Sequence, residues 1–236
     1  MPFLLKYQHP ILTYHRIGDS GDPTMTVSRE AFERQMSFLK DGDRLISVAE
    51  LAARLASPEA FSSKKVAVTF DDGFEDIYTD VFPMVQKQYI PVTVFLVTAW
   101  IGKKGFLAWE TIREMSRGGV DFGSHTRSHV YLPSVSSRKT LEGEIRGSKE
   151  FLEEKLGKEV PLFSYPVGGF TEEIKEVVRQ AGYRAAVTTN RGEGRGKRDL
   201  YALTRIKMTE ASTPSWIFRI KTSGYYEQFK RKKSPC

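Results

Sequence analysis

The chain has 236 residues, which is long enough for one large α/β domain, and its 40% hydrophobic and 28% charged residues are ordinary for a globular protein. It contains no apolar run of roughly eighteen residues and no secretion-signal pattern at residues 1–7, so we expect no transmembrane helix and a cytoplasmic location. The net charge is +7, and the only cysteine is Cys236, which excludes an intramolecular disulfide and a cysteine-based metal site.

Short apolar strands alternate with amphipathic helices along the whole chain. The predicted strands cover Ile11–His15, Lys65–Phe70, Pro91–Val97, Val120–Ser124, Leu162–Tyr165, Arg184–Thr188 and Leu203–Lys207. The predicted helices cover Ser28–Lys40, Ser47–Leu55, a segment from the Asp-Asp-Gly sequence through Val85, Trp109–Arg117, Ser136–Leu156, Thr171–Gln180 and Thr213–Lys221. This alternation predicts parallel βαβ units, either in a barrel or in a doubly wound sheet. About seven strands favour the barrel slightly.

The positive charge lies in the C-terminal fifth, where residues 191–236 hold 12 Lys and Arg against 4 Asp and Glu. We expect residues 211–236 to form a closing helix followed by a basic tail. The tail is either a solvated end or a contact for an anionic surface such as a membrane. Its interleaved aromatic residues would also suit single-stranded nucleic acid. The closing helix explains them more simply, so we expect no nucleic-acid partner.

Two adjacent carboxylates, Asp71 and Asp72, directly follow the apolar strand that ends at Phe70. A second predicted strand ends at Ser124 and is followed by His125 and His129, which are two of only four histidines. An Asp-Asp-Gly sequence alone is usually a turn, and a lone His-x-x-x-His pair on a surface usually has no function. Here both follow buried strands, and ligands gather at the carboxyl ends of parallel strands. His15 and Tyr165-Pro166 fall at such ends as well.

One carboxylate and two imidazoles form a three-ligand set for zinc that leaves a position open for water. With Asp72, His125 and His129 as the ligands, the metal would lower the pKa of that water towards about 7. Asp71 is then free to take the proton as the water attacks a carbonyl carbon. The residues therefore predict metal-assisted hydrolysis of an amide or an ester.

The segments 69–73 and 124–129 together resemble the first two motifs of the polysaccharide deacetylase superfamily (NodB homology, carbohydrate esterase family 4). Residues 12–16, the helix from Val27 to Met36, Ile46-Ser47 and residues 109–114 extend the resemblance, which covers roughly residues 10–210. It implies a single domain over residues 1–236 with a distorted, incomplete (β/α) barrel. It further implies Asp71 as the catalytic base and Asp72, His125 and His129 as ligands of Zn²⁺ or a related divalent ion. The expected partner is an N-acetylated glycan or sugar.

The sequence departs from the family pattern in two places. The usual third motif, Arg-x-Pro-Tyr, is Ser164-Tyr165-Pro166-Val167-Gly168 here, so the Arg that would orient the base is replaced by Ser164. Asp199 and Arg205 are candidates for the missing charge partner. A backbone amide near Val167 is a candidate oxyanion donor, with Tyr165 and Pro166 beside the substrate. The alternative is that Pro166 only shapes the turn.

The second departure is the general acid, because no histidine follows His129. His15 is the candidate that remains, and a purely structural hydrogen bond is its alternative role. The sequence as a whole predicts a metal-dependent enzyme that removes N-acetyl groups from an N-acetylated sugar or polysaccharide. Two alternatives stay open: a catalytically weak carbohydrate-binding relative, and a nucleic-acid or membrane-surface binder that uses the basic tail.

Overall fold

Seven parallel strands close into a barrel in the computed structural model, which describes residues 9–19, 21–57, 61, 63–190 and 199–226. The strands follow one another in the order β1 (Ile11–Tyr14), β10 (Leu203–Lys207), β9 (Ala185–Thr188), β8 (Leu162–Ser164), β7 (Asp121–Ser124), β6 (Val92–Leu96) and β5 (Val66–Phe70). β1 then pairs with β5, with Thr13 opposite Thr69, and this pairing closes the ring. The prediction of a barrel is therefore confirmed, and the alternative of a doubly wound sheet is wrong.

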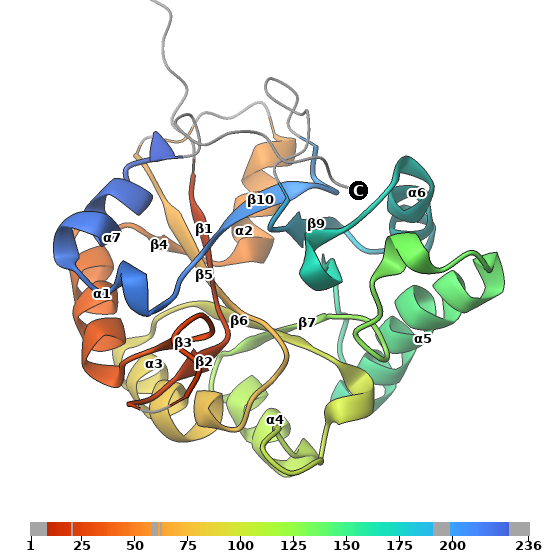
Figure 1. Ribbon diagram of the computed structural model, residues 1–236, viewed down its shortest axis with the longest axis horizontal. Helices are drawn as coiled ribbons and strands as arrows, with labels where there is room; N and C mark the ends of the chain where they lie inside the picture. Colours follow the sequence, from red (N-terminus) through yellow and green to blue (C-terminus); the bar gives the residue numbers. More distant parts are fainter. Residues whose placement is uncertain (1–8, 20, 58–60, 62, 191–198, 227–236) are drawn as a thin grey trace, which may run out of the picture.

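Helices lie around the outside of this ring (Figure 1). They are α1 (Arg29–Asp41), α3 (Phe82–Gln88), α4 (Trp109–Arg117), α5 (Arg138–Leu156), α6 (Glu172–Gln180) and α7 (Ser215–Lys221). Helix α2 (Val48–Ala56) begins as predicted, because the Ser47 hydroxyl accepts a hydrogen bond from the backbone N–H of Glu50 at 3.0 Å. Side chains of α2 pack with barrel residues in one apolar cluster that includes Val48, Leu51, Ile11, Ala67 and Phe95.

Alternation of side chains along each strand decides what fills the inside of the barrel. On β1, Ile11 and Thr13 lie on one face, and on β5 Ala67 and Thr69 do the same, in register with them. The apolar members of this face pack towards α2, whereas Thr13 and Thr69 lie nearer the carboxyl ends of the strands. The barrel interior is therefore apolar at one end and polar at the other, and the polar end leads into the candidate site.

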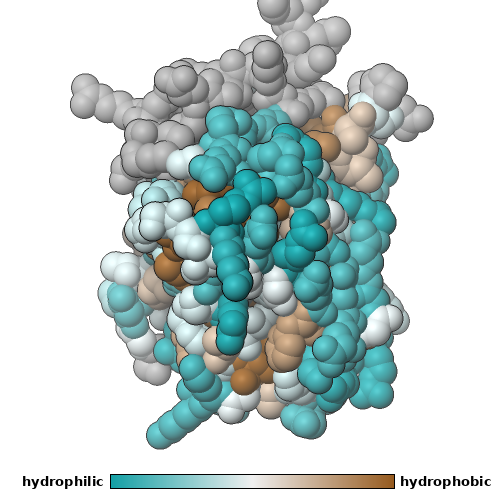
Figure 2. All heavy atoms as spheres, turned by 90° about the vertical axis from the view of Figure 1, so that its right-hand side faces the viewer, coloured by the Kyte–Doolittle hydropathy of each residue, from teal (hydrophilic) through white to brown (hydrophobic). Residues whose placement is uncertain are grey.

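The other face of the strands packs against the surrounding helices. The largest apolar cluster includes Leu12, Val68 and Phe70 from the strands together with Phe32 and Met36 from α1. On the side that carries α5 and α6, the outer surface is mostly hydrophilic with small, separate apolar areas (Figure 2). These helices are thus amphipathic, as the sequence predicted.

The structure differs from the predicted elements at several boundaries. β1 ends at Tyr14, β6 covers Val92–Leu96 and β8 ends at Ser164, so each strand is slightly shorter than predicted. Three short strands were not predicted: β2 (Arg16–Ile17), β3 (Thr26–Val27) and β4 (Leu45–Ile46). β4 pairs with β5 outside the closed ring, and β2 pairs with β3 separately. Strands of two residues carry no readable alternation, which explains why the sequence did not reveal them.

The segment after the Asp-Asp-Gly turn begins with a π-helical turn at Ile77–Val81 and continues as α3 to Gln88, beyond the predicted end at Val85. No helix in the described ranges is long and apolar enough to cross a membrane. The closing helix is present as α7, whereas residues 227–236 of the predicted basic tail lie outside the described residues. The extent of the domain over residues 1–236 stays a prediction.

Candidate active site

A sharp turn at the end of β5 places both carboxylates at the polar end of the barrel. Asp72 and Gly73 adopt left-handed backbone conformations, with φ of 72° and 76°. In an extended strand the side chains of Asp71 and Asp72 would point to opposite faces, and the turn at Asp72 ends that alternation. The positive φ of Gly73 favours glycine, and a Cβ there would lie 2.7 Å from Cδ2 of Leu96, so a side chain would also displace Leu96.

Asp71 is bound on both carboxylate oxygens by Arg205 of β10. Nη1 donates to Oδ1 at 2.7 Å and Nη2 donates to Oδ2 at 2.6 Å. Arg205 is only 2% exposed, and its Nη1 also donates to the hydroxyl of Thr69 at 3.1 Å. Of the two partners that the sequence suggested, Arg205 therefore lies at the base, while Asp199 is paired with Lys175 at 2.6 Å.

Ser164, at the position of the arginine in the family motif, contacts both Arg205, the partner of Asp71, and His125. Its hydroxyl accepts a hydrogen bond from Nη2 of Arg205 at 2.9 Å, and its carbonyl oxygen lies 2.8 Å from Nδ1 of His125. The carbonyl can only accept, so Nδ1 of His125 carries the proton and donates it. The lone pair of Nε2 in the same ring is then available to a ligand.

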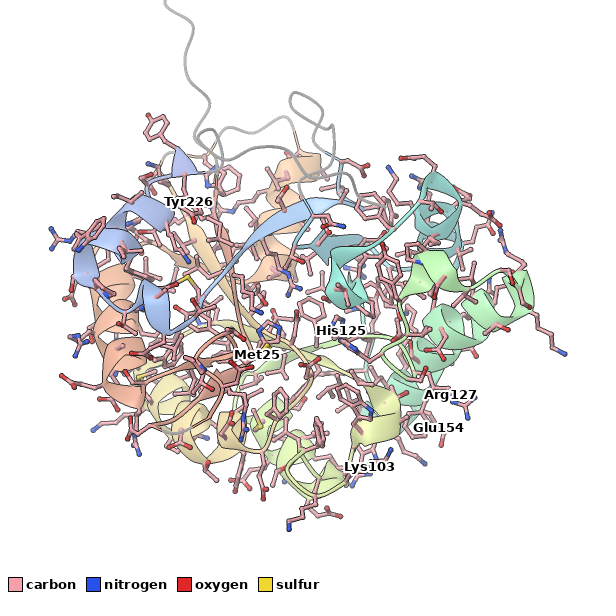
Figure 3. The ribbon with its side chains drawn as sticks, in the orientation of Figure 1. Met25, Lys103, His125, Arg127, Glu154 and Tyr226 are labelled. Atoms are coloured by element: carbon pink, nitrogen blue, oxygen red, sulfur yellow. The ribbon has the colours of Figure 1, made fainter. Side chains whose placement is uncertain are left out.

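His125, His129 and Asp72 meet at the mouth of the barrel, and His125 lies near the centre of the ring of strands (Figure 3). Nε2 of His129 is 3.4 Å and Nε2 of His125 is 3.7 Å from Oδ1 of Asp72. One ligand atom from each of the three residues lies within 4.8 Å of the others. The structure thus brings the three predicted ligands together, with Asp71 next to them: its Oδ2 is 4.0 Å from Nε2 of His125.

Burial and neighbouring charges give the two carboxyls opposite properties. Burial disfavours the charged form of Asp71, but the guanidinium of Arg205 outweighs burial and holds the pKa of Asp71 well below its usual range. Burial, and then the charge of Asp71, raise the pKa of Asp72 to about 7. The charges of Arg205 and Lys207 act in the opposite direction on Asp72 but do not outweigh burial and the charge of Asp71.

The three residues fit a divalent metal ion by an independent criterion. Oδ1 of Asp72 is buried and has no hydrogen-bond partner within the described part of the chain. Burial lowers the pKa of His125 to about 4 and also lowers that of His129, so both imidazoles are neutral at pH about 7 and can bind metal. An orphaned carboxylate oxygen facing two neutral imidazoles is a donor set that suits zinc.

His15 follows β1 and lies close to the same groups. Asp71, Arg205, Lys207 and His129 all influence its charge, and burial lowers its pKa to about 4. Its Nδ1 is buried and finds no hydrogen-bond partner among residues 9–19, 21–57, 61, 63–190 and 199–226. His15 is therefore a neutral imidazole beside the candidate site at neutral pH. The alternative role, a structural hydrogen bond, is therefore not made through Nδ1 within the described residues.

In the third motif, Tyr165 and Pro166 are buried, whereas Val167 is exposed. The Tyr165 side chain is buried, and its hydroxyl donates to the carbonyl oxygen of Tyr201 at 2.9 Å, so it stabilises the fold away from the metal ligands. Pro166 is also buried, whereas the Val167 side chain is 67% exposed. Val167 has φ of 57°, a left-handed conformation that is rare for a β-branched residue. Strained backbone of this kind concentrates at functional sites.

Sequence reasoning missed several residues that support the site. The Trp100 ring packs on His129 with centroids 5.1 Å apart, and the Phe106 ring packs on Trp100 at 5.0 Å. These rings come from the loop after β6, which shows no periodic signal. Glu144 of α5 was also missed. It is a charged residue on the buried helix face that also carries the apolar residues Leu141 and Ile145, and a charge among them was the available signal.

The sequence of this chain is similar to sequences of known proteins. The sequence model of a family described as polysaccharide deacetylase matches residues 59–186. The chain is 31% identical over 207 residues to YxkH, a provisionally assigned polysaccharide deacetylase of Bacillus subtilis (strain 168), covering 87% of this chain and 73% of that protein. It is 24% identical over 223 residues to the poly-β-1,6-N-acetyl-D-glucosamine N-deacetylase of Staphylococcus aureus (strain MRSA252), covering 86% and 74%.

Among solved structures, the deacetylase PplD of Streptococcus pyogenes in complex with acetate has a similar fold. The TM-score is 0.81 at 26% sequence identity, and the match covers 91% of this chain and 97% of that chain. Fold and sequence comparisons therefore agree with each other.

Proposed function

This chain belongs to the polysaccharide deacetylase family, and we propose that it removes N-acetyl groups from an N-acetylated polysaccharide by metal-dependent hydrolysis. As a member of this family it is a hydrolase that acts on carbon–nitrogen bonds other than peptide bonds. The substrate class is proposed from a relative named for deacetylation of poly-β-1,6-N-acetyl-D-glucosamine. The supporting observation is the meeting of Asp72, His125 and His129 next to an Asp71 that Arg205 keeps ionised.

In the proposed reaction, Asp72, His125 and His129 hold a divalent ion, for which Zn²⁺ is the best fit. When bound, such an ion supplies Lewis acidity, which polarises the amide carbonyl and lowers the pKa of water. The hydrogen bond from His125 to the carbonyl oxygen of Ser164 keeps the histidine in the tautomer that can bind the ion. The residues of the chain then have to orient the acetyl group and move protons.

Asp71 is proposed as the base that accepts the proton of the attacking water. Its oxygens already accept two hydrogen bonds from Arg205, so the lone pairs that remain are restricted to other directions. Because its pKa is low, Asp71 is ionised throughout the pH range in which the histidines are neutral. For the same reason it is a weak base that holds the proton only briefly, before the proton passes to the amine that leaves as acetate forms.

His15 and Val167 complete the proposal. The imidazole of His15 is neutral, so as general acid it would first receive the proton that Asp71 takes from water and would then relay that proton to the amine. The exposed, left-handed turn at Val167 makes its backbone amide the candidate donor to the developing oxyanion, with Tyr165 and Pro166 shaping that turn. The cytoplasmic location and the contact of the basic tail with an anionic surface stay predictions.

The catalytically weak alternative rested partly on the missing arginine, and Arg205 now supplies that charge from another strand. A test is acetate release from oligomers of N-acetylglucosamine, β-1,6- and β-1,4-linked, by metal-loaded and chelator-treated protein. We expect release that needs metal and that falls by about a hundredfold or more in Asp71→Asn. Asp121→Asn is a matched control, because Asp121 is a partly buried aspartate at the start of β7, the end of that strand away from His125. This variant should leave the rate of acetate release unchanged. No release from any acetylated glycan would contradict the proposal.

A further inference from the structure

Helix α5 contacts the segment that carries both histidine ligands, and the contact is made by one buried carboxylate. Glu144 is 9% exposed. Its Oε2 accepts the backbone N–H of Arg127 at 3.0 Å and the backbone N–H of Ser128 at 2.9 Å. Its Oε1 accepts the hydroxyl of Ser128 at 2.7 Å. All three donors come from the residues between His125 and His129.

One turn further along the same face of α5, Ser148 contacts the residue before His125. The Ser148 hydroxyl donates to the carbonyl oxygen of Ile145 at 2.9 Å, and it lies 2.7 Å from the hydroxyl of Ser124. Because the Ser148 proton is used on Ile145, Ser124 is the donor in the second bond. Residues four apart lie on one helix face, so Glu144 and Ser148 hold the segment on both sides of His125.

The segment needs this support because its own backbone is unfavourable. Thr126 and His129 have φ of 67° and 62°, a left-handed conformation that costs free energy in residues other than glycine. Within the turn, the backbone N–H of His129 donates to the hydroxyl of Thr126 at 3.0 Å. The intervening backbone N–H groups of Arg127 and Ser128 donate to Glu144. The side chain of Arg127 takes no part in these bonds and extends outwards on the α5 side, away from His125 near the centre of the barrel (Figure 3).

We propose that Glu144 is a positioning residue for the metal site: by binding the backbone between the two histidines, it fixes the distance and angle between His125 and His129. This inference rests on the proposed function, because it concerns the same metal. A carboxylate suits the task because two N–H groups converge on one of its oxygens, and hydrogen bonds to a charged acceptor are the stronger kind. Residues that orient metal ligands in this way typically change metal affinity about ten- to a hundredfold when they are replaced.

The same helix provides a matched control. Glu153 also accepts a backbone N–H, that of Val160 at 2.9 Å, and it pairs with Lys149, but neither contact involves the histidine segment. Replacing Glu153 therefore removes a comparable bond between α5 and a loop, with no effect on the ligands. The contrast between Glu144 and Glu153 separates positioning of the metal from general stabilisation of the fold.

The experiment measures Co²⁺ binding to the full chain by chelator competition, together with the visible spectrum of bound Co²⁺ and the melting temperature of the metal-free protein. We expect Glu144→Ala to weaken Co²⁺ binding about ten- to a hundredfold and to change the spectrum. Glu144→Gln should recover most of the affinity, because its amide oxygen can still accept both backbone N–H groups while the Ser128 hydroxyl turns to accept from the amide. Glu153→Ala should lower the melting temperature and leave affinity and spectrum as in the wild type.

Wild-type affinity and spectrum in Glu144→Ala would overturn the inference even if its melting temperature fell. If Glu144→Ala does not fold, Glu144→Met takes its place, because it fills a similar volume and offers no oxygen to the backbone N–H groups of Arg127 and Ser128. Unchanged Co²⁺ affinity in Glu144→Met would equally overturn the inference. Absence of Co²⁺ binding to the wild type would instead overturn the proposed metal site, and the inference with it.

Discussion

Arg205 and Asp71 form a buried ion pair with two parallel hydrogen bonds, of 2.7 Å and 2.6 Å, although they are 134 positions apart in the chain. β10 lies beside β1, and β1 lies beside β5, so closure of the barrel brings the guanidinium to the carboxylate. Without closure, β10 and β5 would each lie second from opposite edges of an open sheet. The fold thus creates the charge environment of the proposed base.

Replacing Arg205 should destabilise the protein strongly, because it leaves the Asp71 carboxylate buried without a cation. We expect Arg205→Met to reduce the free energy of unfolding at neutral pH by about 3–5 kcal/mol. Since the folded pKa of Asp71 lies below its unfolded value, the pair contributes stability above pH about 4 and loses that contribution as pH falls through the folded pKa. Urea unfolding of both proteins at neutral pH and at lower pH measures this difference.

The double variant Arg205→Met, Asp71→Asn is the control for that prediction. It removes the unpaired charge, so it should be more stable than Arg205→Met alone. Equal stability of the single and double variants would show that loss of side-chain packing, rather than an uncompensated charge, explains the effect.

Metal binding should release a proton from Asp72 when the solution is below neutral pH. Burial and the neighbouring Asp71 raise the pKa of Asp72 to about 7, whereas burial lowers the pKa of His125 to about 4. At pH about 6 the metal-free site therefore holds a proton on Asp72 and none on His125, and the metal has to displace that proton. We expect protonation of Asp72 to lower the apparent affinity about tenfold for each pH unit below about 7.

Isothermal titration calorimetry in buffers of different ionisation enthalpy measures the number of protons released. At pH about 6 Asp72 should release close to one proton, and at about 8 it should release close to none, so that a proton released there comes from metal-bound water. Asp72→Asn should bind metal much more weakly and lack the Asp72 proton at pH about 6. Equal proton release by the wild type and Asp72→Asn at pH about 6 would contradict the assignment of the raised pKa to Asp72.

Gly123 in β7 should not tolerate a side chain, because its neighbours inside the barrel leave no space. A Cβ at this position would lie 2.5 Å from Cδ1 of Phe95 and 2.9 Å from the carbonyl oxygen of Leu162. We expect Gly123→Ala to destabilise the protein by about 1–3 kcal/mol, as measured by thermal unfolding. Gly147→Ala in α5 is the control, because a Cβ there meets no atom within 4 Å, and it should be neutral or stabilising. A stable Gly123→Ala would indicate that β6 and β7 are less tightly packed than the structure shows.

His15→Gln tests whether His15 takes part in the chemical step. If His15 passes a proton to the amine, this variant should lower kcat about a hundredfold while metal affinity stays as in the wild type. Deacetylation rate and Co²⁺ affinity are measured on the same preparation. A wild-type kcat would leave His15 without a catalytic role.

Most of the barrel could be predicted because its strands and helices carry clear periodic patterns. The two motifs were equally readable, since Asp71, Asp72, His125 and His129 each follow an apolar strand and strand ends meet in a parallel sheet. Family resemblance then assigned different roles to the two carboxylates. The pKa values of the two carboxyls shift in opposite directions, whereas their division into base and ligand stays a proposal.

The supporting contacts were harder to predict because they join elements that are distant in sequence. Arg205 was only one of two candidate partners, because nothing in a single strand shows which strand it will lie beside. Its position in an alternating strand was the only local sign that it points into the barrel. Glu144 gave even less signal, because its partners are backbone N–H groups, which have no sequence signature.

Anomalous diffraction from crystals of the protein loaded with Zn²⁺ locates the metal directly. The structure predicts one strong peak bonded to Asp72, to Nε2 of His125 and to His129, with Asp71 bound to Arg205 and not to the metal. A peak bonded to Asp71 in place of Asp72, or a metal bound away from the two histidines, would contradict the account.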